Sequence, residues 1–170
     1  MASSTVSLSF RYLKSDIVRA MRSHYASFLR PRFDIVMAVG LVALGAYFWR
    51  SPSSHWFGVL FVVASAFFAL ILVAAFLVIP PVAFRHQPKF RDEYSLTFSP
   101  DGIHFQTEHI NSHLEWSIYS RALVDAHSYL LYWGSRTFTI IPRRVFQNTE
   151  QQGAFEQLLA ERIPKIVRKA

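Results

Sequence analysis

The chain has 170 residues, of which 52% are hydrophobic and 16% aromatic, with a formal net charge of +7. It contains no cysteine, which excludes disulfide bonds, thiolate catalysis and zinc ribbons. Residues 1–92 hold 10 Lys and Arg against 3 Asp and Glu, whereas residues 93–170 hold 8 against 8. A nucleic-acid-binding domain needs its positive charge on the folded surface that docks the phosphates. This distribution favours anionic lipid, and not nucleic acid, as the partner of the basic segments.

The first patterned segment is Thr5–Tyr12, where every second residue is apolar. This alternation predicts a half-buried strand. Because a lone strand is not stable, it is expected to pair with strands formed later in the chain.

A helix is predicted to begin at Ser15, a good N-cap residue with Asp16 in the first turn, and to end before Pro31. Its apolar residues share one face, and the opposite face carries Arg19, Arg22 and Arg30. This pattern is typical of a helix that lies on a membrane surface, where these arginines would contact anionic lipid headgroups. The same apolar face could instead pack on a cytosolic domain, and the two interpretations stay open.

Two apolar runs follow and predict a transmembrane hairpin. There is no charged residue from Ser51 to Phe84, and at 1.5 Å per residue the 24 residues of Trp56–Ile79 would reach about 36 Å, enough to cross a bilayer. The spans are predicted at about 33–50 and 56–80, and Pro80, Pro81 and Pro88 are expected to end the second helix. The first run is shorter, so a re-entrant or half-buried helix is the alternative for it.

Basic residues indicate the orientation of this hairpin. Six precede the first span, and only Arg50 lies between the spans. Both termini are therefore expected to be cytoplasmic. A cleaved signal peptide is not expected, because a charged segment precedes the first apolar run. Small residues in both spans would allow close packing within the hairpin, the simpler use, or dimerisation: Gly40, Ala43, Gly45, Ala46, Ala64, Ser65, Ala66 and Ala69.

Beyond Pro88 the pattern predicts strands, over about 93–141, and then a helix over about 149–163. Ser99–Gly102 has the residues of a type I turn, and Asn111–Ser112 is expected to form the next turn. Leu114, Trp116 and Ile118 would then face inward, and Gly134–Ser135 would join two further apolar strands. Thr149 with Gln152 resembles a capping box, and Pro164 ends the helix. We expect one antiparallel sheet of six or seven strands, the N-terminal strand included, closed by this helix.

Motifs for catalysis or cofactor binding are not found in the sequence: it has no Gly-rich phosphate loop, no Gly-x-Ser-x-Gly and no His-Glu-x-x-His. The chain is therefore expected not to be an enzyme and to bind no cofactor. With a turn at Asn111–Ser112, Glu108 would lie opposite Glu115, near His113 and His104. An exposed polar sheet face is the favoured interpretation of this group, and whether it binds a cation stays open. By the same register, His109 would end the inward face as a packed rim residue.

Arg143 and Arg144 form a second basic site that could hold anionic headgroups, together with Arg136 and the basic C-terminal tail. The alternative is that these charges are simply solvated.

Four segments carry a family resemblance: Trp116–Ser117, Tyr129–Tyr132, Ile141–Phe146 and the helix that follows. Taken with the layout of the chain, they resemble the YcxB-like family of bacterial membrane proteins. The resemblance implies an architecture of an N-terminal strand and helix, a two-span hairpin and a pleckstrin-homology-like (PH-like) domain, in the bacterial inner membrane. Arg143–Arg144 departs from the Pro-Lys-Arg more usual in the family, although the basic character is kept.

The sequence thus predicts an α+β membrane protein in three parts. Residues 1–32 form the N-terminal strand and amphipathic helix, 33–84 the transmembrane hairpin, and 85–170 a cytosolic PH-like antiparallel domain. The expected function is a non-enzymatic binding or regulatory module with an unidentified protein partner. The alternative is a structural or assembly subunit that uses its hairpin in a larger complex, and homo-oligomers are possible.

Overall fold

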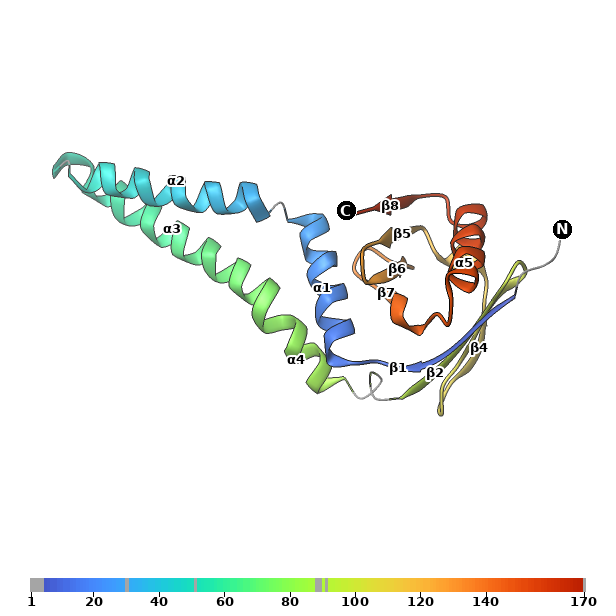
Figure 1. Ribbon diagram of the computed structural model, residues 1–170. Helices are drawn as coiled ribbons and strands as arrows, with labels where there is room; N and C mark the ends of the chain where they lie inside the picture. The colour runs from blue at the N-terminus through green and yellow to red at the C-terminus, as the bar shows by residue number, and fades with distance from the viewer. Residues whose placement is uncertain (1–4, 30, 51, 88–89, 91, 170) are drawn as a thin grey trace. The chain divides into compact units, whose positions relative to one another are not determined.

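The computed structural model of the chain describes residues 5–29, 31–50, 52–87, 90 and 92–169. It contains two compact units (Figure 1). The helical unit comprises Met21–Ala83, and the β unit comprises the residues up to Ala20 and from Phe84 onward. Two helices contribute residues to both units: α1 (Lys14–Phe28) and α4 (Ile79–His86). The second half of the predicted amphipathic helix is therefore grouped with the hairpin.

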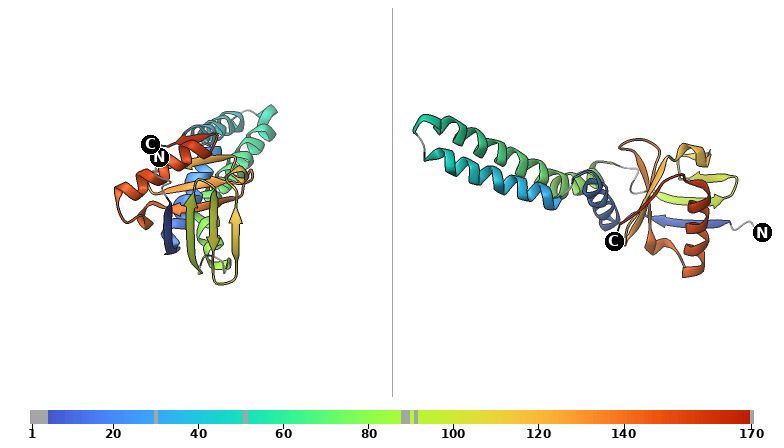
Figure 2. Two further views of the ribbon diagram at one scale, coloured as in Figure 1. Left: turned by 90° about the vertical axis from the view of Figure 1, so that its right-hand side faces the viewer. Right: turned by 90° about the horizontal axis from the view of Figure 1, so that it is seen from above.

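In the helical unit, α2 (Pro31–Trp49) and α3 (His55–Val73) run side by side and are joined by the short helix η1 (Pro52–Ser54) (Figure 2). By length and composition, Arg32–Trp49 of α2 and the helical stretch His55–His86, which begins with α3, could each cross a membrane. Small residues allow their close approach, because a Cβ atom on Gly45 would lie 2.7 Å from Val62 Cγ2 and one on Gly58 2.9 Å from the Trp49 amide nitrogen. Ser65 Oγ donates a hydrogen bond to the Ala38 carbonyl at 3.0 Å. The predicted packing within the hairpin is confirmed at Gly45 and Ser65.

The second apolar helix ends at His86, before Pro88, one of the three prolines expected to end it. The prediction was wrong for Pro80 and Pro81, which lie within the helix. A π-helical segment, η2 (Ala74–Val78), connects α3 to α4, which continues through both prolines. The Ile79 amide donates to the Ala74 carbonyl, five residues earlier, as π-helical geometry requires. The wider turn accommodates the proline rings, which would otherwise clash with the preceding helical turn.

In the β unit, the first sheet has the strand order β1-β2-β3-β4. Its strands are β1 (Val6–Arg11), β2 (Glu93–Ser99), β3 (Gly102–Gln106) and β4 (Asn111–Leu114). β1 pairs antiparallel with β2, and Val6 lies opposite Phe98. Alternate residues of β1 are buried. The prediction that the N-terminal strand joins a sheet from later in the chain is confirmed (Figure 2).

A second sheet, with the order β7-β6-β5-β8, corrects the prediction of a single antiparallel sheet. Its strands are β5 (Arg121–Val124), β6 (Ser128–Tyr132), β7 (Phe138–Pro142) and β8 (Ile166–Arg168), and β8 is parallel to β5. The chain leaves the first sheet at the 3-10 helix η4 (Trp116–Ile118), which replaces the predicted strand there. Trp116 Nε1 donates to the Ser99 carbonyl at 2.7 Å and holds this break in place, while Ile118 is exposed and does not face inward. The α+β class is confirmed.

The C-terminal helix α5 (Thr149–Arg162) contributes to the core next to both sheets. The Phe155 ring lies 4.8 Å from that of Phe98 on β2 and 5.2 Å from that of Tyr129 on β6. The N-cap is Asn148, whose side chain accepts from the Gln151 amide at 2.7 Å. The capping residue predicted at Thr149 was therefore one position too late, since Asn148 caps equally well.

Candidate functional site

Arg144 connects the N-terminal and C-terminal segments of the β unit. It lies in the 3-10 helix η5 (Arg143–Val145), which follows β7. Its Nη2 lies 2.6 Å from Asp16 Oδ2 and donates to the Arg11 carbonyl at 2.7 Å. Asp16 Oδ2 also accepts from the Leu13 amide at 2.9 Å, so the same carboxylate caps α1. A guanidinium held in this way supports the fold and is not simply a solvated charge.

Tyr12 strengthens the same junction. Its hydroxyl donates to the Ile140 carbonyl of β7 at 2.6 Å, and its ring lies 5.7 Å from that of Phe90. Burial raises the pKa of the Tyr12 hydroxyl well above its ordinary value, so it stays a neutral donor at physiological pH. Together with Arg144, Tyr12 fixes the start of α1 against the second sheet.

Arg143 packs inward as well. Its guanidinium carbon lies 4.8 Å from the centre of the Tyr129 ring, a cation–π contact, and Nη2 lies 3.9 Å from Glu156 Oε1. Its Nε is buried without a hydrogen-bond partner among the described residues. The two neighbouring arginines therefore bind different parts of the protein. Arg143 contacts Tyr129 and Glu156, and Arg144 contacts Asp16.

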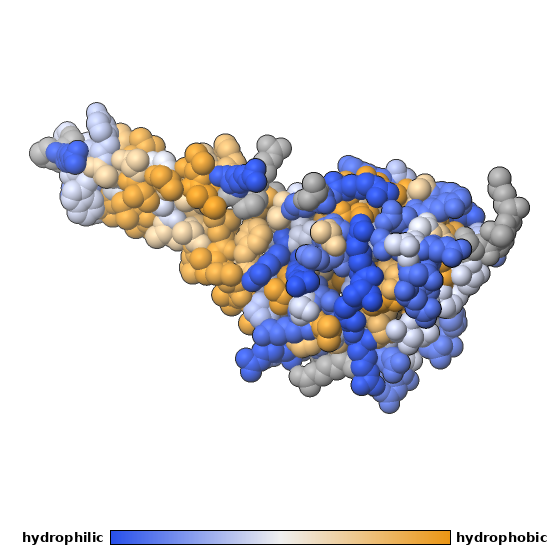
Figure 3. All heavy atoms as spheres, in the orientation of Figure 1, coloured by the Kyte–Doolittle hydropathy of each residue, from blue (hydrophilic) through white to orange (hydrophobic). Residues whose placement is uncertain are grey.

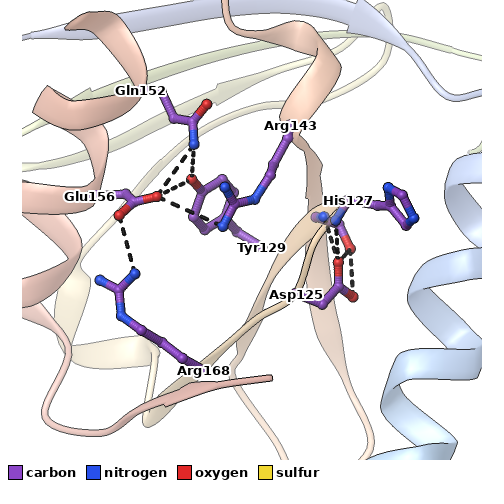
Figure 4. Close-up of polar contacts among 8 residues, drawn as sticks. Asp125, His127, Tyr129, Arg143, Gln152, Glu156 and Arg168 are labelled. Carbon is purple, nitrogen blue, oxygen red and sulfur yellow. Dashed lines mark hydrogen bonds and ion pairs between the residues drawn. The ribbon is translucent and has the colours of Figure 1, made fainter. Parts of the chain in front are cut away.

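Arg143 belongs to a polar cluster centred on Glu156 of α5 (Figure 4). We call it the Glu156 cluster: Tyr129, Arg143, Gln152, Glu156 and Arg168. The Tyr129 hydroxyl donates to Glu156 Oε1, and Gln152 Nε2 donates to the Tyr129 hydroxyl at 2.8 Å. On the other side, Arg168 Nη1 donates to Glu156 Oε2 at 3.3 Å. The carboxylate thus joins α5 to β6 and β8.

The electrostatics keep this carboxylate ionised. The hydrogen bond from Tyr129 is the main cause that lowers the pKa of Glu156, with further lowering by Gln152 and Arg168. Burial, and then the bond to Glu156, raises the pKa of Tyr129. Both carboxylate oxygens accept hydrogen bonds from the protein, so Glu156 forms a structural cross-link.

The arginines predicted on the amphipathic helix have different surroundings. Arg19 is exposed on α1, as the lipid-contact prediction requires. Arg22 is also exposed, but its Nε donates to the Phe76 carbonyl at 2.8 Å. Arg30 lies outside the described residues. Of the five arginines predicted to contact lipid, Arg22, Arg143 and Arg144 thus make contacts within the protein.

The predicted turn at Asn111–Ser112 was wrong, and so was the pairing of Glu108 with Glu115 that depended on it. The turn between β3 and β4 lies at Thr107–Ile110, so Asn111 and Ser112 belong to β4 and pair with Gln106 and Phe105. This shift places Glu108 and His109 in the exposed turn, with no packed rim position for His109. Glu115 accepts instead from Ser117 Oγ at 3.0 Å.

Two histidines do come together across the strands, His104 opposite His113. The His113 ring lies over Gly102, where a Cβ atom would be 2.6 Å from its Nε2. Within the described ranges there is no group of three or more side chains that could hold a metal ion.

The sequence interpretation missed the Glu156 cluster. Gln152 and Glu156 are four residues apart on α5, a spacing that places them on one helix face. That signal was present, but the partners Tyr129 and Arg168 lie on other elements. Only the packing of α5 between the sheets brings them together.

Part of the β unit is similar to a known protein family. Residues 98–159 match a family model described as YcxB-like protein. The matched segment runs from the end of β2 to α5 and confirms the family resemblance drawn from the sequence. No curated protein and no solved structure was found to match the chain.

Proposed function

From the YcxB-like character of residues 98–159, we propose that this chain is a two-span membrane protein whose β unit is a non-enzymatic, PH-like binding or regulatory module at the cytoplasmic face of the bacterial inner membrane. The observation that carries the proposal is the exposure of apolar side chains on both long helices. A helix in the core of a soluble protein would bury most of them.

On α2, Val36 is 67% exposed, and on α3, Phe67 is 64% exposed. Apolar side chains gather over the visible face of the hairpin (Figure 3). Exposing apolar surface to water costs about 25 cal/mol of free energy for each Å², whereas the same surface is stable in hydrocarbon. A bilayer is the environment that these helices fit.

Aromatic residues at the hairpin tip support the same placement. Tyr47, Trp49 and Trp56 are strongly exposed, as expected of side chains at a membrane–water interface. The chain enters and leaves the hairpin at the end away from this tip, so the segments before and after it share one side of the membrane. The excess of basic residues before the first span assigns the cytoplasm to that side.

The β unit fits a docking role better than a catalytic one. Its Glu156 cluster and its Arg144 contact are used to hold its own elements together. Arg19 is exposed and available to anionic headgroups, to which each basic side chain near the surface contributes about 1 kcal/mol. A protein partner that docks on the β unit completes the proposal.

Topology reporters test the membrane part. A reporter fused at Ser53 should be active on the periplasmic side, and one fused at Ala170 on the cytoplasmic side. Finding both reporters on the same side would overturn the two-span arrangement. Carbonate extraction of the unfused chain is the control, since a chain that lies on the surface would be released.

A structural subunit of a larger membrane complex is the second candidate, and Gly40 favours it. This glycine is exposed on α2, and a Cβ atom there would have nothing within 4 Å. An outward-facing glycine lets a further helix approach closely. Crosslinking from Gly40→Cys to a different membrane protein would support this role, and a chain that stays monomeric in native membranes would argue against it.

A further inference from the structure

We propose that Arg22 is a clip that fixes the first helix α1 to the second span, by supplying the hydrogen bond that the proline pair removes from the Phe76 carbonyl. This clip would set the angle of the helix at Pro80 and Pro81. The inference concerns the helical unit, Met21–Ala83, and rests on the membrane insertion proposed above, but not on the orientation of the hairpin or on a role for the β unit.

The argument begins with a missing donor. In an α-helix the Phe76 carbonyl would accept from the amide of residue 80, and in a π-helix from that of residue 81. Both residues are prolines and have no amide hydrogen. The Ile79 amide is directed to Ala74 and so does not serve as a substitute. The Phe76 carbonyl therefore has no main-chain partner available from the next turn.

A carbonyl without a partner is costly next to apolar surroundings. Arg22 Nε meets this need by donating at 2.8 Å. One turn further along α1, the Tyr25 ring lies 6.5 Å from the Phe76 ring, so the same face of α1 makes a second contact at the same residue. Arg22 and Tyr25 are three residues apart and thus neighbours on the helix surface.

The position of the contact suggests a conformational role. A π-helical segment followed by two prolines is a place where a helix bends, because its hydrogen-bond ladder is interrupted. Pro80 is fully buried, so packing restrains the helix at the prolines. Arg22 binds the freed Phe76 carbonyl and restrains the helix at that residue. With the clip broken, α4 would be free to change its angle to α1.

The absence of cysteine makes a distance measurement direct. Spin labels on Ser27→Cys in α1 and Val82→Cys in α4, both exposed positions, report the distance between these helices in the full chain in lipid nanodiscs. We expect a single narrow distribution for the otherwise unchanged protein. Arg22→Met, which removes both the donor and the charge, should broaden or shift it, whereas Arg19→Met, the matched loss of charge on α1, should leave it unchanged.

A compensating change separates the clip from general destabilisation. Adding Pro80→Ala and Pro81→Ala to Arg22→Met restores amide donors to Phe76 and should narrow the distribution again. Backbone amides at residues 82 and 83 should exchange about tenfold faster in Arg22→Met and return toward the original rate in the combined variant. If Arg22→Met does not assemble, Arg22→Lys, which keeps the charge and a donor, should give an intermediate width.

Three results would overturn the proposal. The first is an unchanged distribution in Arg22→Met, which would mean that the carbonyl does not need this donor. The second is equal broadening in Arg19→Met, which would assign the effect to lost charge. The third is broadening that persists when the prolines are replaced, because the restored amides would then have failed to substitute for Arg22.

Discussion

Arg144 and Asp16, which are 128 residues apart in the chain, form an ion pair in which Nη2 lies 2.6 Å from Oδ2. The Asp16 side chain is only 10% exposed. Removing one partner leaves a largely buried charge, a strongly destabilising change. This ion pair and the pairing of β1 with β2 make the N-terminal segment part of the β unit.

Arg144→Gln should therefore lower the free energy of unfolding of the β unit by about 1–3 kcal/mol, since Arg144 itself is partly exposed. Arg136→Gln removes the same charge from an exposed position and should change the stability by less than about 0.5 kcal/mol. Denaturant unfolding followed by near-ultraviolet circular dichroism measures both. Equal midpoints for the two variants would show that the pair contributes nothing.

The N-terminal strand makes a second prediction. Leu8 is 3% exposed and lies opposite Leu96, so Leu8→Ala should cost about 2–4 kcal/mol. Ser9→Ala, its exposed neighbour, is the control.

A truncation tests the contribution of the whole strand β1. Residues 93–170 fused to residues 1–12 should melt at a higher temperature than residues 93–170 alone. Equal melting temperatures and equal amide protection would show that β1 is dispensable.

Glu156 makes the stability depend on pH. Its pKa is lowered in the folded chain, chiefly by the hydrogen bond from Tyr129, so the ionised carboxylate stabilises the fold above the unfolded pKa of about 4.3. This contribution is lost as the pH falls through the lower folded value. The melting temperature of the original chain should exceed that of Glu156→Gln at pH 7, and the difference should shrink on acidification below about pH 4. A difference that does not vary with pH would refute this account.

Two glycines of α2 should differ in their tolerance of a side chain. Gly45→Leu meets Val62 and the Gly58 carbonyl, so it should force the hairpin apart and lower its melting temperature in detergent. Gly40→Leu faces open space and should leave the isolated chain as stable or slightly more so. If Gly40→Leu is the more damaging variant, Gly40 is used in a contact with another molecule.

Local patterns in the sequence determined much of this architecture. Alternation identified β1, because one of its faces is buried against the core and the other lies in solvent. The uncharged run from Ser51 to Phe84 predicted the long second helix, and Pro100 and Gly102 marked the turn between β2 and β3. In each case the signal is contained within a few residues and has a direct physical cause.

Tertiary structure decided the features that depend on distant partners. All five residues of β6 are buried, so its sequence has no alternation to show which sheet it joins or that the sheets are two. The parallel strand β8 is three residues long and exists because β5 offers it an edge. The helix could pass Pro80 because π-helical geometry makes room for the ring and Arg22, far away in sequence, satisfies the freed carbonyl. The positive charge of Arg22, Arg143 and Arg144 likewise did not predict what each side chain binds, because a guanidinium binds whichever acceptor the fold brings within reach.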